Sequence, residues 1–470
     1  MSAATSSSKG SAKPSSGSSI SLAGLPAVIE DARQATLSSD AGPAEPKNYA
    51  NLVARLNAAK DKFPPLYHTN FCAPFIATIE ALGATAFAKI LARDPDREST
   101  AGLLFDLAQA ILQPGEDYQQ GPTRAYQEYI SDLYDGYLGA ESRHGVKPPD
   151  RGVIPPLVKW GNPDFGPYTW PVDATASFKV KAGVVNLPPA NASAGLVAWG
   201  ALGHETSGHD ILHADNGLLE ELTATVQSRL APLGHGLADY WSLRMDETAS
   251  DVQGLLNLGP AAGIGLVAYF RGLLSAYGGK AVLRNEGPAG DPHPADIVRG
   301  YLASEVVALL SFKGAKAWAT AIAKETDKDV KKIVLAGQTV PTAVAKKSAK
   351  LIAQSLVQTK LKSLEKHALG EIQNWADSDE ALVASLRVSL RDGTPIDFDN
   401  SETTIYAAHL VAAAIIEACA TGHDIAGLQN RLIAALNRLH DKNPSWGPLY
   451  VAHPSDICRD FFISPKCRQI

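Results

Sequence analysis

Apolar side chains recur at helical spacing along most of this chain, and that periodicity restricts its fold more than any other feature. From Leu103 to Leu112 and from Tyr126 to Tyr137 they fall every three or four residues, the spacing that places them on one face of an α-helix. Ser177 to Leu187 shows the alternating, β-branched pattern of a strand, one of very few strand signals in the chain. We therefore expect a mainly α protein with a small β-sheet near residues 175–190.

The same patterns divide the chain into four parts. Residues 1–24, rich in Ser, Ala, Gly and Lys, are expected to form a disordered tail. Residues 25–146 are expected to form an N-terminal helical domain, residues 147–312 a central domain and residues 313–470 a C-terminal helical region. Within the central part, Lys147 to Asp173 contains seven prolines and two tryptophans and is expected to be a structured loop.

Composition excludes several classes of protein. Of the 470 residues, 45% are hydrophobic and 20% charged, so the chain is not disordered throughout. A net charge of −6 lacks the positive excess of a nucleic-acid or polybasic membrane binder. We see no apolar stretch of about 20 residues and no secretory signal, and expect no membrane span and a cytoplasmic or otherwise intracellular location. Lys324 to Lys366, rich in lysine, is expected to be a solvated helical face.

The four cysteines show no zinc-binding spacing and are too few for a disulfide scaffold at this length. Cys458 and Cys467 are close enough in sequence to pair, but reduced cysteines are the default expectation. The cysteines therefore indicate neither a zinc site nor a disulfide framework.

One segment, Leu202 to Asp215, concentrates groups that can perform chemistry. It holds three of the twelve histidines in the chain, His204, His209 and His213, and Glu205 directly follows the first. A zinc-hydrolase helix needs two imidazoles that converge on one metal and a carboxylate beside them that takes a proton from the bound water. The segment therefore predicts a hydrolytic metal centre.

The spacing within this segment differs from the usual one. The HExxH form places its histidines four residues apart, whereas His204 and His209 are five apart, which is about 140° around an ideal helix. The two imidazoles can share a metal only if the helix is distorted, as in a single π-turn. Gly208 lies between them, and a residue without Cβ eases such a distortion.

HETSGH resembles the HExxGH signature of the dipeptidyl peptidase III family of zinc metallopeptidases, which is of gluzincin type. That family takes its third ligand from a downstream helix with the motif EECRAE, whose second Glu binds zinc. Asp246 to Asp251 reads DETASD, which places Glu247 at the ligand position. The resemblance covers roughly a tenth of the chain. It implies that His204, His209 and Glu247 bind Zn²⁺ and that Glu205 is the general base.

Glu220 and Glu221 are rival candidates for the third ligand because they lie closer in sequence. Glu247 is favoured because Glu247 and Asp251 fall four residues apart, on one face of an expected helix. That face can carry both a ligand and a carboxylate that accepts the free N–H of a ligand histidine. We expect Asp251 to be that carboxylate.

Two other interpretations of the segment remain open. In the first, His209 and His213 form an HDxxH variant with Asp210 as the base. In the second, the histidines are structural and pair with Asp210, Asp215 and Glu220.

Stabilisation of an oxyanion in this chemistry needs a donor across the cleft. His293, Arg299 and Tyr301 lie close together just before or within an expected helix, and His293 and Tyr301 are the predicted site residues, with Tyr240 a lesser alternative. The strand Ser177 to Leu187 is a candidate edge for pairing with an extended peptide.

Together these patterns predict a zinc-dependent hydrolase in which the motif helix is buried centrally in a multi-helix, metallopeptidase-like body. Its central domain, residues 147–312, would be the metal-binding catalytic domain, and its partner a peptide or small amide substrate. The alternatives are a metal hydrolase acting on a non-peptide amide or ester, and a non-catalytic helical protein with a structural histidine cluster. The sequence carries no signal of oligomeric state.

Overall fold

The helical periodicity of the sequence is realised over most of the chain. The computed structural model describes residues 20–139, 143, 145–150, 154–399 and 404–447. Helices contain 65% of the residues and strands 6%, so the prediction of a mainly α fold with little β-structure is confirmed. Most of the predicted tail, and both Cys458 and Cys467, lie outside the described residues.

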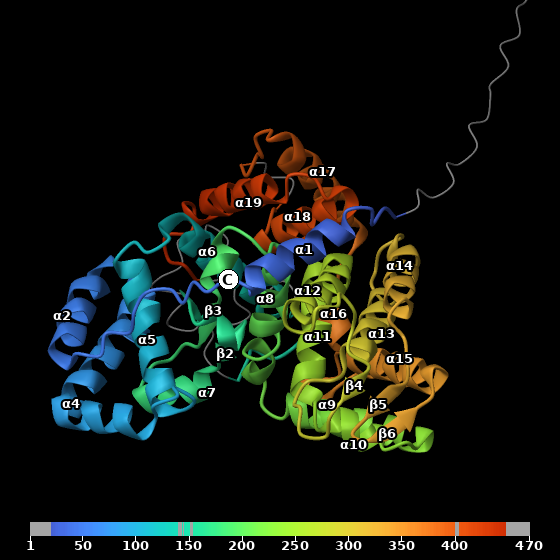
Figure 1. Ribbon diagram of the computed structural model, residues 1–470, viewed down its shortest axis with the longest axis horizontal. Helices are drawn as coiled ribbons and strands as arrows, with labels where there is room; N and C mark the ends of the chain where they lie inside the picture. The colour runs from blue at the N-terminus through green and yellow to red at the C-terminus, as the bar shows by residue number, and fades with distance from the viewer. Residues whose placement is uncertain (1–19, 140–142, 144, 151–153, 400–403, 448–470) are drawn as a thin grey trace, which may run out of the picture.

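The α-helices run in three groups along the chain (Figure 1). The first group contains α1 (Leu25–Thr36), α2 (Tyr49–Ala59), α3 (Pro65–Tyr67), α4 (Ala73–Arg93), α5 (Thr100–Gly115) and α6 (Gln120–Leu138). The second contains α7 (Val172–Thr175), α8 (Val197–Ser207), α9 (Leu218–Leu230), α10 (Leu237–Ser242), α11 (Met245–Leu258), α12 (Pro260–Gly278) and α13 (Asp296–Val307). The third contains α14 (Ala315–Asp327), α15 (Thr342–Gln358), α16 (Leu369–Ile372), α17 (Asp377–Asp392), α18 (Ala407–Thr421) and α19 (Ile425–His440).

The first of two three-stranded sheets lies in and after the proline-rich segment. Its strands are β1 (Leu157–Trp160), β2 (Tyr168–Trp170) and β3 (Val184–Leu187), in the order β1-β3-β2. The segment predicted as a loop therefore contributes two strands. The strand predicted over Ser177 to Leu187 is shorter, because Ala176–Phe178 forms a 3₁₀ turn.

The predicted role of that strand as a substrate-binding edge is wrong. β3 pairs in parallel with β1 on one side and antiparallel with β2 on the other. Both of its edges are thus occupied, and all four of its residues are buried. The edge strand beside α8 is β2.

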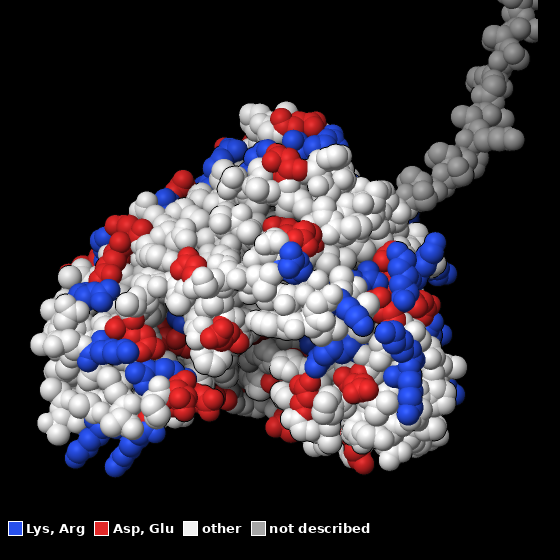
Figure 2. Space-filling model, viewed as in Figure 1, with Lys and Arg blue, Asp and Glu red and all other residues white. Residues whose placement is uncertain are grey.

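The second sheet consists of β4 (Glu286–Gly287), β5 (Ile333–Leu335) and β6 (Gln338–Val340). Ala336 and Gly337 connect β5 to β6, and both have positive φ, as a two-residue hairpin turn of type I′ requires. This hairpin interrupts the lysine-rich segment that was predicted as a helical face. Lysine and arginine side chains gather over α14 and α15 on the surface (Figure 2).

Two hydrophobic cores lie within the described residues. The smaller is formed by α2, α3, α4 and α5 together with residues of β1 and β3, and the larger by α1, α6 and the helices from α8 to α19, with other residues of the same strands. Helix α1 leaves its neighbours in sequence and packs across α12 and α18, and α6 packs against α19. Helices from different predicted parts of the chain therefore pack against one another. The surface is hollowed between the lobe of α2, α4 and α5 and the lobe of α9 and α10 (Figure 2).

Among the described residues, one helical segment, Pro65–Arg93, has the length and composition of a membrane span, although it is kinked at Gly83, where φ is 72°. It was not expected from the sequence because polar residues interrupt its apolar runs. Its most apolar window has a mean hydropathy of 1.6 and is 22% buried. Phe75, Ile79 and Phe87 on its inner face pack in the smaller core. A core helix passes the same test of length and composition, so no span is established.

Candidate metal centre

The centre forms where α8 and α11 pack against each other. A Cβ added to Gly203 would lie 2.7 Å from Leu258 Cδ1, and one added to Gly208 would lie 2.4 Å from the backbone Cα of Ser250. The second contact is with backbone and cannot be relieved by a rotamer change. Glycine at position 208 is therefore required by the close approach of the two helices.

The chain brings His209 towards His204 by ending the helix. Helix α8 ends at Ser207, Gly208 caps it, and His209 lies in the turn before the 3₁₀ helix Ile211–Ala214. The predicted π-turn is therefore wrong. Because the chain leaves the helix, the 140° separation of an ideal helix no longer applies, and the two imidazole centroids lie 4.9 Å apart.

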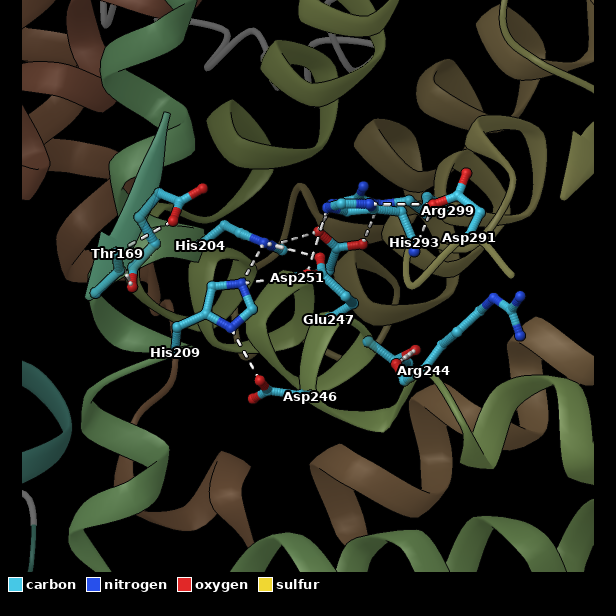
Figure 3. A network of polar contacts seen from close by, with 12 residues as sticks. Thr169, His204, His209, Arg244, Asp246, Glu247, Asp251, Asp291, His293 and Arg299 are labelled. Carbon is cyan, nitrogen blue, oxygen red and sulfur yellow. Dashed lines mark hydrogen bonds and ion pairs between the residues drawn. The ribbon is translucent and has the colours of Figure 1, made fainter. Parts of the chain in front are cut away.

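Three donor groups converge at this point (Figure 3). The Nε2 atoms of His204 and His209 lie 3.2 Å apart. Oε2 of Glu247 lies 3.2 Å from Nε2 of His204, and Oε1 of Glu247 lies 3.5 Å from Nε2 of His209. Donors about 2.0–2.1 Å from a tetrahedral zinc ion are separated by about 3.3–3.4 Å. The three separations, two of them to different oxygens of one carboxylate, are close to that value.

A carboxylate orients each imidazole from its other nitrogen. His204 Nδ1 lies 2.9 Å from Asp251 Oδ1, and Arg299 donates two hydrogen bonds of 2.7 and 2.6 Å to the same carboxylate. His209 Nδ1 lies 3.1 Å from Asp246 Oδ2. These contacts leave the two Nε2 atoms facing each other, as metal-binding histidines require. Asp251 thus lies where the sequence analysis expected it.

The electrostatics of the cluster favour a cation. Burial by itself would raise the pKa of Glu247, but the adjacent charge of His204 outweighs it and lowers that pKa to about 2. Burial would lower the pKa of His204, but the carboxylates of Asp251 and Glu247 outweigh it and raise that pKa to about 10. Without a metal, the carboxylates therefore hold protons on the imidazoles, where positive charge is stabilised.

Glu205 directly follows His204 in the sequence, and its side chain lies against the edge strand β2. Thr169 Oγ1 lies 3.1 Å from Oε2 and 3.1 Å from the backbone carbonyl oxygen of Glu205. The strand is itself fixed, because Asp106 accepts hydrogen bonds from Tyr168 (2.6 Å) and Trp170 (2.7 Å). Neither Thr169 nor Asp106 was predicted as a site residue. The sequence signal for Thr169 was the aromatic, proline-rich segment around it, whereas Asp106 lies in an apolar helical run without such a signal.

The donors proposed for the oxyanion separate in the structure. His293 reaches the cluster, with Nε2 3.4 Å from Glu247 Oε1. Tyr301 does not, because its hydroxyl donates to Asp327 at 2.9 Å. Residues two apart on a helix point about 200° apart, so α13 cannot direct both Arg299 and Tyr301 to the cluster. This placement argues against the predicted role of Tyr301.

The lesser alternative, Tyr240, also lies outside the cluster. Its hydroxyl accepts a 2.9 Å hydrogen bond from the backbone of Ala295, and its ring packs against the Arg244 guanidinium. Tyr240 thus stabilises the loop that carries His293 and does not face the converging donors.

The shifted HDxxH frame is not assembled. Asp210 is buried and accepts hydrogen bonds from the Tyr134 hydroxyl and from the backbone of Val172, so its carboxylate faces α6 and α7. His213 Nε2 lies 3.3 Å from Asp246 Oδ1. His213 thus shares Asp246 with His209 and does not converge with it on one point.

The acidic residues nearer in sequence are engaged elsewhere. Glu221 accepts hydrogen bonds from the backbones of Lys362 and Ser363. Asp215 is paired with Arg143 at 2.7 Å. Glu220 is exposed. The pairing of the histidines with Asp215 and Glu220 that the structural interpretation requires is therefore not observed, whereas pairing with Asp246 and Asp251 is.

A pocket of about 490 Å³ opens beside the cluster. His204, Glu205 and His293 line it together with Tyr269 of α12, a residue that the sequence analysis missed. Burial and the nearby charge of Glu205 raise the pKa of Tyr269, so its hydroxyl keeps its proton and can donate. The pocket therefore gives a small molecule access to the motif residues.

His204, His209 and Glu247 are the one group of three potential ligands found within the described ranges of the chain. Comparisons with protein families, with curated proteins and with solved structures found no match. Only the geometry of the site therefore indicates a function.

Proposed function

We propose that this protein is a zinc-dependent hydrolase that cleaves peptide or other amide bonds. The observation that carries the proposal is the convergence of His204, His209 and Glu247 at separations of 3.2, 3.2 and 3.5 Å. Two imidazoles and one carboxylate are a common ligand set of catalytic zinc sites.

The residues present fit a zinc ion in a second respect. Oε2 of Glu247 is buried and accepts no hydrogen bond, although His204 Nε2 lies 3.2 Å away. A buried carboxylate oxygen without a donor is costly, and a cation between these atoms would remove that cost. When bound, zinc would supply Lewis acidity and lower the pKa of a coordinated water.

In this proposal the side chains around the ligands have separate tasks. Glu205 would accept a proton from the attacking water and return it to the leaving amine. Thr169 would orient the Glu205 carboxylate by its hydroxyl contact. His293 and Tyr269, which line the same pocket, would donate hydrogen bonds to the oxyanion that develops on the carbonyl.

The metal content of the protein tests the first part of the proposal. Protein purified without added metal is expected to contain one zinc per chain, and His204→Ala is expected to contain none. His423→Ala is the matched control, because His423 is exposed and outside the cluster, and it is expected to retain zinc. Absence of stoichiometric zinc from the unaltered protein would show that the histidine cluster is structural.

A digest of a peptide library tests the second part. Cleavage that depends on His204 supports a peptidase. Zinc binding without peptide cleavage, together with turnover of non-peptide amides or esters, would assign the site to the alternative class of metal hydrolase. Zinc binding without turnover of any of these substrates would contradict the proposed catalysis.

A further inference from the structure

The pocket beside the cluster has an apolar part that the proposed chemistry does not use. Its volume is about 490 Å³. On α8, Val197, Ala201 and Glu205 line it, four residues apart and therefore on one helical face. The apolar floor formed by Val197 and Ala201 thus leads directly to the proposed general base.

The opposite wall comes from α12, and α1 covers one side. Leu266, Tyr269 and Leu273 follow one face of α12 at spacings of three and four residues and line the pocket. Ala35 lines it from α1, the helix that packs across α12. The side chains of Leu266 and Leu273 are only partly buried, so they present apolar surface to whatever occupies the pocket.

The two arginines that line the pocket are already paired. Arg284 donates to Asp296 at 2.9 Å, and Arg299 donates to Asp251 at 2.6 and 2.7 Å. An anionic ligand group would therefore meet no unpaired arginine, and a charge of either sign would lose its hydration without compensation in the apolar part. The apolar part of the pocket therefore selects an uncharged occupant.

We propose that this pocket binds an uncharged apolar group that the substrate carries on one side of the bond to be cleaved. The assignment to a substrate rests on the function proposed above, whereas the binding of an apolar group does not. An apolar cavity of about 150 Å³ holds one benzene molecule, so about 490 Å³ accommodates roughly three six-membered rings or a chain of similar volume. The expected substrate class is thus an amide with a bulky aromatic or long aliphatic substituent.

Binding of N-phenyl-1-naphthylamine, a neutral fluorophore of three six-membered rings, tests the pocket without catalysis. The unaltered protein is expected to bind one molecule with enhanced fluorescence. Ala201→Phe fills the floor and is expected to weaken binding at least tenfold. Ala317→Phe, at an exposed alanine of α14, is the matched control and is expected to change the affinity less than twofold.

A second pocket variant tests the proposal independently, so that the conclusion does not depend on correct folding of Ala201→Phe alone. Leu273→Asp places a charge on the partly exposed wall and is also expected to weaken binding at least tenfold. Leu243→Asp is its control, because Leu243 is 79% exposed and does not line the pocket. If both pocket variants melt like the unaltered protein and bind the fluorophore unchanged, the proposal is wrong, whatever the activity of the protein.

Turnover decides whether the bound group belongs to a substrate. Two series of amides are compared, in which an alkyl chain grows on the acyl side or on the amine side of the scissile bond. In one series kcat/KM is expected to rise about fourfold for each added methylene until the pocket is filled, and this rise is expected to disappear in Ala201→Phe. Turnover without any dependence on chain length would overturn the proposal while leaving the hydrolase intact. A complete lack of turnover would overturn the proposed function and with it the substrate assignment.

Discussion

His204 Nδ1 lies 2.9 Å from Asp251 Oδ1, while His204 Nε2 lies 3.2 Å from Glu247, one helical turn earlier on α11. One face of α11 therefore supplies both a candidate ligand and the carboxylate that orients the other ligand. This arrangement requires α8 and α11 to lie close together, which the glycine at position 208 permits.

Asp251→Asn is expected to lower the zinc affinity about 10- to 100-fold, because a ligand histidine loses the partner that orients it. It is also expected to reduce stability, since Arg299 is left buried beside a neutral group. Asp329→Asn is the matched control, because Asp329 is also buried and paired with an arginine, Arg271. It should reduce stability without changing the zinc affinity. A competition titration with a chromophoric chelator measures the affinity, and an equal affinity in Asp251→Asn would contradict the orienting role.

The variants Glu205→Gln and Glu247→Gln are expected to lose activity for different reasons. The first removes the proposed base and leaves the ligands, so zinc should remain bound while kcat falls by about 10²- to 10⁴-fold. The second removes an anionic ligand, so the zinc content itself should fall. Metal analysis and kinetics on the same preparations separate the two roles. Loss of zinc from Glu205→Gln to the same extent would show that the roles are wrongly assigned.

Thr169→Val is expected to lower kcat about tenfold without loss of zinc, because the Glu205 carboxylate loses the hydroxyl that positions it. Thr169→Ser restores the hydroxyl and should recover most of the activity. Rescue by serine distinguishes positioning from packing, because serine lacks the methyl group. If valine supports full turnover, the contact has no role in catalysis.

Gly208→Ala is expected to separate α8 from α11, because its Cβ would lie 2.4 Å from Ser250 Cα. We expect a loss of about 1–3 kcal/mol in the free energy of unfolding and a weaker affinity for zinc. Gly290→Ala serves as the control, since a Cβ there meets nothing within 4 Å. Chemical denaturation and metal titration measure the two effects, and normal zinc affinity in Gly208→Ala would show that the close approach is not needed for the site.

Part of the pH dependence of stability is expected to come from the buried pair of Glu128 and His440, whose side chains lie 3.3 Å apart. Burial raises the pKa of Glu128 from 4.5 to about 8, so its contribution to stability is present below pH 4.5 and lost as the pH rises through 8. Burial lowers the pKa of His440 from 6.5 to about 4, so its contribution is present above pH 6.5 and lost as the pH falls through 4. The contribution of this pair should therefore be greatest between pH 4.5 and 6.5 and fall on both sides of that range.

Glu128→Gln is expected to make the alkaline side of the profile shallower, because glutamine carries no proton to lose. Denaturant unfolding of both proteins at pH 5, 7 and 9 measures the difference. Glu220→Gln, at an exposed glutamate of α9, is the control and should follow the unaltered protein. An unchanged alkaline slope in Glu128→Gln would place the titrating group elsewhere.

The sequence was sufficient for the properties that depend on near neighbours along the chain. Helical periodicity predicted the fold class, because an amphipathic helix shows its buried face at a spacing of three to four residues. The same reasoning placed Glu247 and Asp251 on one face of one helix, and the structure has both on α11. It also singled out His204 and His209, because their clustering is visible without any tertiary information.

The tertiary structure decided everything that depends on contacts between distant segments. The end of α8 at Ser207 and the close approach of Gly208 to α11 brought the two imidazoles together. Strand β2 brought Thr169 to Glu205, and the rotation of α13 turned Tyr301 away. Short strands within a proline-rich segment carry too few residues to show a period. Local patterns thus determined which groups are present, and only the packing of helices and strands decided which of them meet.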